Sequence, residues 1–146
     1  MKKRISQKES NKKLVSILKE WQKIESRSIA GVSKILGKIS NPLVKEIFKI
    51  IKQDSINHKN VQQFIVNSLE KKAISLTPEE LGTIWTSIEE HIKMERATIA
   101  LGQEAKAASS NFVHRYLINY LLTDERKHDD MLEQLENLKK KIYPYA

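Results

Sequence analysis

The chain has 146 residues, a formal net charge of +8 and no cysteine. This length is typical of one domain, so we expect a single domain over 1–146. The absence of cysteine excludes disulfide bonds and metal sites built from thiolates. The sequence has no apolar run of about 18 residues, which predicts no membrane span. No apolar segment follows the basic residues 1–4, which argues against a secretory signal and favours a cytoplasmic protein.

The positive charge raises the question of a nucleic-acid partner. Lysines are spread along the whole chain and are mixed with acidic and amide residues, as on an ordinary solvated surface. Only the segments 1–13 and 139–141 are locally basic. We therefore do not expect nucleic-acid binding to be the main function.

Apolar residues recur at helical spacing in four segments, and the alternation typical of strands is not found in the sequence. The turn before the third segment, Thr77-Pro78, combines a capping threonine with a proline suited to the first helical turn. The predicted helices run from about 9 to 37–40, from 42 to 67–73, from 78 to about 107 and from 112 to about 144, after a basic tail at 1–8.

The second half of the chain repeats the first at an offset of 70 residues. Glu25 matches Glu95 and His58 matches His128 at this offset, and both predicted interhelix turns contain the dipeptide Ser-Asn. We therefore predict an all-α antiparallel four-helix bundle that is built from two repeated helical hairpins. The repeats cover about 9–72 and about 79–142.

The fourth predicted helix carries Glu125 and His128, which lie three residues apart and therefore on one helix face. A Glu-x-x-His pair that faces the interior of a helical bundle is a metal-binding motif. The first repeat holds an altered copy in which Ser55 precedes His58. The repetition of a histidine at this spacing favours a metal ligand over an isolated core histidine.

Two further carboxylates, Glu25 and Glu95, lie in otherwise apolar stripes of the first and third helices. A buried carboxylate costs several kcal/mol unless it is paired or bound to a metal. The midpoint of Glu25 and Ser55 is position 40, in the first turn, and that of Glu95 and Glu125 is position 110, in the second. Each hairpin should therefore bring its ligands to one level. The predicted metal ligands are Glu25, His58, Glu95, Glu125 and His128.

This pattern resembles the ferritin-like di-iron carboxylate family, and most of all its rubrerythrin-type and erythrin-type members, over residues 9 to 142. The family places a glutamate on helices 1 and 3 and a Glu-x-x-His pair on helices 2 and 4. The resemblance implies these roles: terminal carboxylates Glu25 and Glu95, terminal imidazoles His58 and His128, bridging carboxylate Glu125, and ligand-orienting Asp54 and Asp124.

The chain departs from the family at Ser55, which replaces the second bridging glutamate. Two divalent ions would then meet three carboxylates, and hydroxide, an external anion or Asp54 would supply the remaining charge. Three outcomes stay open: a site for one ion, an asymmetric site for two ions, or an empty relic. A second departure is Thr98, which stands where rubrerythrin-type peroxidases carry an additional glutamate, and it weighs against a peroxidase.

His91 lies one turn before Glu95 and on the same helix face. It is therefore a candidate additional ligand. Trp21 occupies the matching position in the first repeat, which favours a role for His91 in the core or behind the ligands.

The resemblance implies one or two iron ions, with zinc or manganese as alternatives, and oxidase-type or peroxidase-type chemistry on O2 or peroxide in oxidative stress or iron handling. Since the chain has no rubredoxin-type cysteines, electrons would come from an external donor protein. The alternative is a degenerate bundle that sequesters metal or serves in assembly without catalysis, so enzyme activity is left open. We expect a homodimer. The connection at 67–77, about ten residues, barely crosses such a bundle, so we favour either the family's crossover or an exchange of hairpins between two chains, and a plain antiparallel turn also fits.

Overall fold

The computed structural model describes residues 6–74 and 77–142. Over these residues it contains four helices and no strand, which confirms the all-α prediction. The first helix begins at Gln7, inside the segment 1–8 that was predicted to be a tail. Residues 1–5, part of the connection at 67–77 and the predicted helix end near Pro144 lie outside the described residues. The helices are α1 (Gln7–Leu36), α2 (Pro42–Glu70), α3 (Pro78–Ala108) and α4 (Phe112–Ile142).

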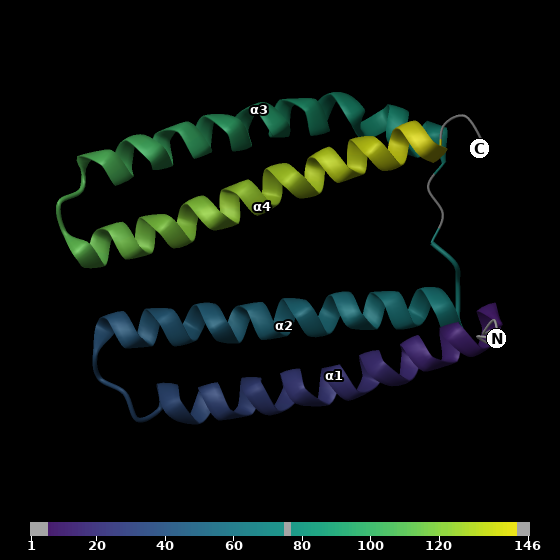
Figure 1. Ribbon diagram of the computed structural model, residues 1–146, viewed down its shortest axis with the longest axis horizontal. Helices are drawn as coiled ribbons and strands as arrows, with labels where there is room; N and C mark the ends of the chain where they lie inside the picture. Colours follow the sequence, from purple (N-terminus) through teal and green to yellow (C-terminus); the bar gives the residue numbers. More distant parts are fainter. Residues whose placement is uncertain (1–5, 75–76, 143–146) are drawn as a thin grey trace, which may run out of the picture. The chain divides into compact units, whose positions relative to one another are not determined.

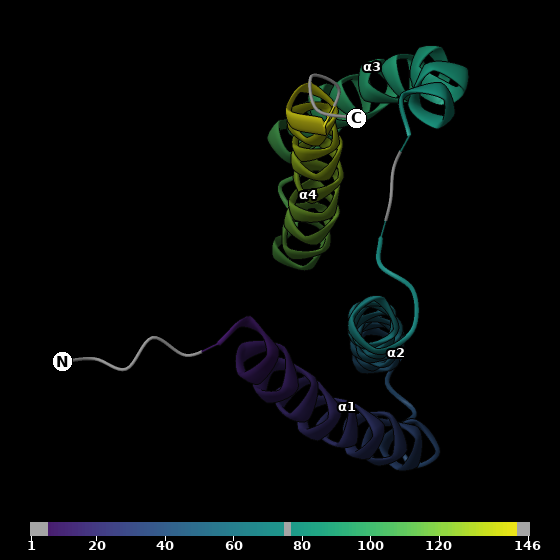
Figure 2. The same ribbon diagram turned by 90° about the vertical axis from the view of Figure 1, so that its right-hand side faces the viewer.

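The chain divides between residues 74 and 75 into two compact units, and each unit contains one helical hairpin. Within the first unit α1 contacts α2, and within the second α3 contacts α4 (Figures 1 and 2). Lys19 meets Glu70 near the open end of the first hairpin, while Glu25 meets His58 closer to the turn. From the first of these contacts to the second, the residue number rises along α1 and falls along α2, so the two helices run antiparallel.

Side-chain caps fix the beginnings of all four helices. The hydroxyls of Ser6 and Thr77 accept hydrogen bonds from the backbone N–H groups of Glu9 and Glu80. The two glutamates in turn accept bonds from the backbone N–H groups of the capping residues, which completes a capping box on α1 and on α3. The side-chain oxygens of Asn41 and Asn111 cap α2 and α4 in the same way as the hydroxyls. These caps satisfy backbone donors that have no partner inside the helix, which explains why the sequence signals located the helix starts well.

A close contact between α3 and α4 sets the separation of these two helices. Gly102 faces Leu122, and a Cβ atom added at Gly102 would lie 2.7 Å from Leu122 Cδ2. Leu122 is buried, so its side chain has little room to withdraw. The absence of a side chain at Gly102 therefore lets the second hairpin close at this level. The counterpart of Gly102 at the offset of 70 is Val32, a buried core residue of α1.

Each hairpin has a narrow buried strip and a wider apolar surface that stays exposed. The buried apolar side chains are Leu18, Val32, Val66, Leu81 and Leu122. Large apolar side chains such as Ile24, Phe64, Leu101 and Met131 are more than half exposed. Two helices can cover only one stripe of each other, so the remaining apolar surface of a hairpin is available for further packing. Over the described residues, none of the helices is long and apolar enough to cross a membrane.

Candidate metal centre

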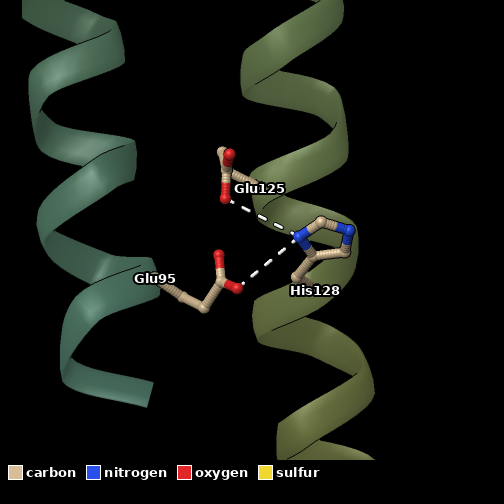
Figure 3. Close-up of side chains that lie close together, drawn as sticks. All are labelled: Glu95, Glu125 and His128. Carbon is tan, nitrogen blue, oxygen red and sulfur yellow. Dashed lines mark ion pairs between the residues drawn. The ribbon is translucent and has the colours of Figure 1, made fainter. Parts of the chain in front are cut away.

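Three predicted ligands converge in the second hairpin. Glu95 projects from α3 toward Glu125 and His128 of α4, and the three side chains face one another between the helices (Figure 3). One ligand atom from each residue lies within 4.8 Å of the other two. His128 Nδ1 is 3.5 Å from Glu95 Oε1 and 3.7 Å from Glu125 Oε2. Adjacent ligands around an ion at about 2.1 Å are separated by roughly 3–3.5 Å, so these distances are close to those of a coordination shell.

The positions of the three residues follow from helix geometry and from the packing beside them. Glu125 and His128 share one face of α4 because they are three residues apart. Gly102 follows Glu95 by seven residues, or about two turns, on the same face of α3. Leu122 precedes Glu125 by three residues on α4. The tight contact of Gly102 with Leu122 therefore holds both helices close together directly beside the ligands.

The two carboxyl groups of this site form a hydrogen-bonded pair with opposite pKa shifts. A hydrogen bond between Glu95 and Glu125 lowers the pKa of Glu95, and it raises the pKa of Glu125 together with burial. A proton shared by the pair therefore belongs mainly to Glu125, since two adjacent carboxylates resist joint ionisation. Glu95 is the more buried of the two, at 8% exposure. A divalent cation would replace the shared proton.

His91 contacts the same carboxylate from within α3. Its Nε2 lies 2.9 Å from Glu95 Oε1, the oxygen that also faces His128. The His91 side chain is 54% exposed and is not among the three residues whose ligand atoms lie within 4.8 Å of one another. The structure therefore places His91 beside a candidate ligand and outside the three-residue cluster.

The first hairpin brings together two of the predicted ligands. His58 Nδ1 lies 3.3 Å from Glu25 Oε1, and the Glu25 side chain is almost fully buried. At the position that matches Glu125, the buried Ser55 donates a hydrogen bond of 3.2 Å from its hydroxyl to the hydroxyl of Ser28. The two hairpins thus share a glutamate–histidine pair across their helices, and the second hairpin adds a carboxylate.

Asp124, one of the two aspartates that precede these motifs, makes hydrogen bonds within its own helix. Asp124 accepts a hydrogen bond of 2.8 Å from the ammonium of Lys127. This bond is the largest cause of the lowered pKa of Asp124, and a hydrogen bond from Tyr120 contributes further. Asp54 is partly buried on α2. Asp124 thus makes hydrogen bonds with Lys127 and Tyr120 of the same helix.

Sequence reasoning missed one buried polar residue, Gln62, which follows His58 by one turn of α2. It is only 4% exposed, and its carbonyl oxygen Oε1 has no hydrogen-bond partner among the described residues. A signal was present in the repeat, because the matching residue in the second hairpin is the apolar Leu132. A buried amide without a partner for its oxygen is energetically costly.

The donor set of the second hairpin fits a first-row transition metal. Two carboxylates and an imidazole are ligands that suit iron(II), manganese(II) and zinc(II), and three protein ligands leave coordination positions open. The ligand atoms are close enough together to bind one ion, and the buried Glu95 has the hydrogen bonds expected of a ligating carboxylate. A comparison with protein families, curated proteins and solved structures found no match to the chain, so this assignment depends on the chain's own residues.

Proposed function

We propose that the protein binds a divalent transition-metal ion, foremost iron(II), through Glu95, Glu125 and His128. The observation that carries this proposal is the convergence of their ligand atoms within 4.8 Å of one another. They come from two helices whose close contact is fixed by a neighbouring glycine, so the site does not depend on a loop. Sites that are built on helices hold their ligands in more exact positions than sites on loops.

The charges of the site support a cation rather than a purely structural role. The Glu95 carboxylate raises the pKa of Glu125 through a hydrogen bond and through charge repulsion, with burial contributing as well. A stabilising ion pair would need only one carboxylate for the nearby imidazole. A second carboxylate is explained if a divalent charge is to be neutralised, and the proton on Glu125 would leave when the cation binds.

The chemistry that this site supports is reduction of O2 or peroxide by a non-haem iron protein. When bound, iron(II) would supply the electrons for that reduction. Glu95 and Glu125 would neutralise the charge of the ion, and His128 would bind through Nδ1, the nitrogen that faces both carboxylates. The positions that the protein leaves open would admit the oxidant, and an external protein would have to return the electrons.

Metal storage without catalysis is a second candidate, and the first hairpin favours it. There the hydroxyls of Ser55 and Ser28 are hydrogen bonded to each other where the other hairpin has its second carboxylate. Glu25 and His58 alone supply two ligands, fewer than the three or four of ordinary protein sites. A protein that tightly binds one ion and leaves a second site incomplete is suited to hold a metal rather than to turn it over.

An anaerobic titration of the metal-free chain with iron(II) tests the proposal. We expect saturable binding that is lost in Glu125→Ala and in His128→Ala. The matched control is Ser55→Ala, which occupies the position corresponding to Glu125 in the other hairpin and should leave this binding intact. Wild-type protein that binds no metal would refute the proposal. Rapid oxidation of the bound iron by O2 or peroxide would separate the oxidase from the storage protein.

A further inference from the structure

We propose that His91 is a positioning residue that holds the Glu95 carboxylate in place for metal binding. This inference rests on the proposed function, since it concerns how the Glu95 ligand is oriented. His91 precedes Glu95 by one turn on α3, and its Nε2 lies 2.9 Å from Glu95 Oε1. The direction of the bond follows from chemistry, because an ionised carboxylate only accepts hydrogen bonds. His91 therefore donates its Nε2–H to Glu95.

Glu95 Oε1 is shared between two imidazoles. It accepts a hydrogen bond from His91 and also faces His128 Nδ1 at 3.5 Å. A carboxylate oxygen has two lone pairs, so one can accept the hydrogen bond while the other is directed at the centre of the site. The hydrogen bond restricts rotation of the Glu95 side chain. An oriented and polarised carboxylate of this kind is the usual arrangement behind a metal ligand.

His91 is better explained as a support than as a fourth ligand. The group of ligand atoms within 4.8 Å of one another consists of Glu95, Glu125 and His128, without His91. Ligands on opposite sides of one ion lie about 4.2 Å apart when each bond is about 2.1 Å. Since His91 lies outside the group of ligand atoms within 4.8 Å of one another, it contacts the site through the Glu95 carboxylate. The His91 side chain is 54% exposed, so the ring donates to Glu95 from the surface of the hairpin.

Comparison of the two repeats indicates that His91 has a specific role in the metal site and does not only fill space. The position that matches His91 in the first hairpin is Trp21, whose indole has a single N–H donor on a larger ring. Both hairpins keep the glutamate–histidine contact across their helices, at 3.3 Å and 3.5 Å. The second hairpin has both His91 and the third ligand, Glu125. The first hairpin has neither at the matching positions, which are Trp21 and Ser55. This pairing is expected if His91 serves the complete ligand set.

The test is a cobalt(II) titration of the full chain, followed by the visible absorption of the bound ion. We expect His91→Ala to weaken cobalt binding by about 10–100-fold, which is typical for the loss of a partner behind a ligand. Its spectrum at saturation should equal that of the wild type, because the ligands are unchanged. His91→Gln retains a donor at similar reach and should recover most of the affinity. His114→Ala, which removes an exposed histidine of α4, is the control.

Three results would overturn the inference. Unchanged affinity in His91→Ala would show that the hydrogen bond does not matter to the ligand. An altered spectrum at saturation would show that His91 binds the ion directly, and so would a failure of His91→Gln to recover affinity while its helix content is normal. All three outcomes leave the proposed function intact. Wild-type protein that binds no cobalt would instead refute the proposed function and the inference with it.

Discussion

Replacement of Glu125 by glutamine should change stability in opposite directions with and without metal. The variant keeps the size of the side chain and removes the charge next to Glu95. Two unit charges at 4.8 Å, the upper limit for the ligand atoms of this cluster, repel by about 3.5 kcal/mol at an effective dielectric constant of about 20. Sharing of a proton and the 26% exposure of the Glu125 side chain reduce this repulsion. We therefore expect metal-free Glu125→Gln to be more stable than the wild type by about 1–2 kcal/mol, or by roughly 3–8 °C in Tm.

With metal the order should reverse. A ligand present at about 100 times its Kd stabilises the folded state by about 2.7 kcal/mol, and Glu125→Gln should lose most of that gain. Thermal unfolding followed by circular dichroism, in a chelator and in excess cobalt(II), measures both effects. Glu133→Gln on the exposed face of α4 is the control and should change stability by less than about 0.5 kcal/mol. Lower stability of metal-free Glu125→Gln, or equal stabilisation of both proteins by metal, would refute the reasoning.

Three further substitutions test the packing and the repeat. Gly102→Ala should destabilise by about 1 kcal/mol or more because its Cβ would collide with Leu122. Gly82→Ala meets open space and should stabilise by up to about 1 kcal/mol; urea unfolding compares the two. Gln62→Leu should stabilise by about 1–3 kcal/mol in the same assay, since it removes a buried carbonyl oxygen without a partner, and a loss of stability would mean that this oxygen has one. Ser55→Glu should lower metal-free stability and add a second metal equivalent in a titration, while an unchanged stoichiometry would count against a latent site in the first hairpin.

The helices could be predicted from the sequence because their ends carry local signals. Ser6, Asn41 and Thr77 bond to backbone groups a few residues away, so the relevant contacts lie within one turn. The main difference is at the start of α1, where the cap is at Ser6 and not near residue 9. The repeat at an offset of 70 also placed Glu95 level with Glu125, since a short turn fixes which residues of two antiparallel helices face each other.

The finer features of the site depend on contacts that the sequence pattern does not specify. Helical periodicity places His91 on the face of Glu95, but it cannot distinguish a ligand from a donor to a ligand, and only the positions of the ring atoms do so. Asp124 accepts a hydrogen bond from Lys127, three residues along the same helix, and residue spacing alone does not predict this choice of partner. The choice between such local partners depends on side-chain rotamers, which residue spacing leaves open.

The most direct test of the metal centre is X-ray absorption of the iron(II)-loaded chain, which reports the atoms bound to the ion. We predict oxygen ligands together with imidazole nitrogen at about 2.1 Å. The imidazole contribution should fall in His128→Gln and persist in His58→Gln. Iron surrounded by oxygen alone in the wild type, or an imidazole signal that is unaffected by His128→Gln, would contradict the assignment of the site to Glu95, Glu125 and His128.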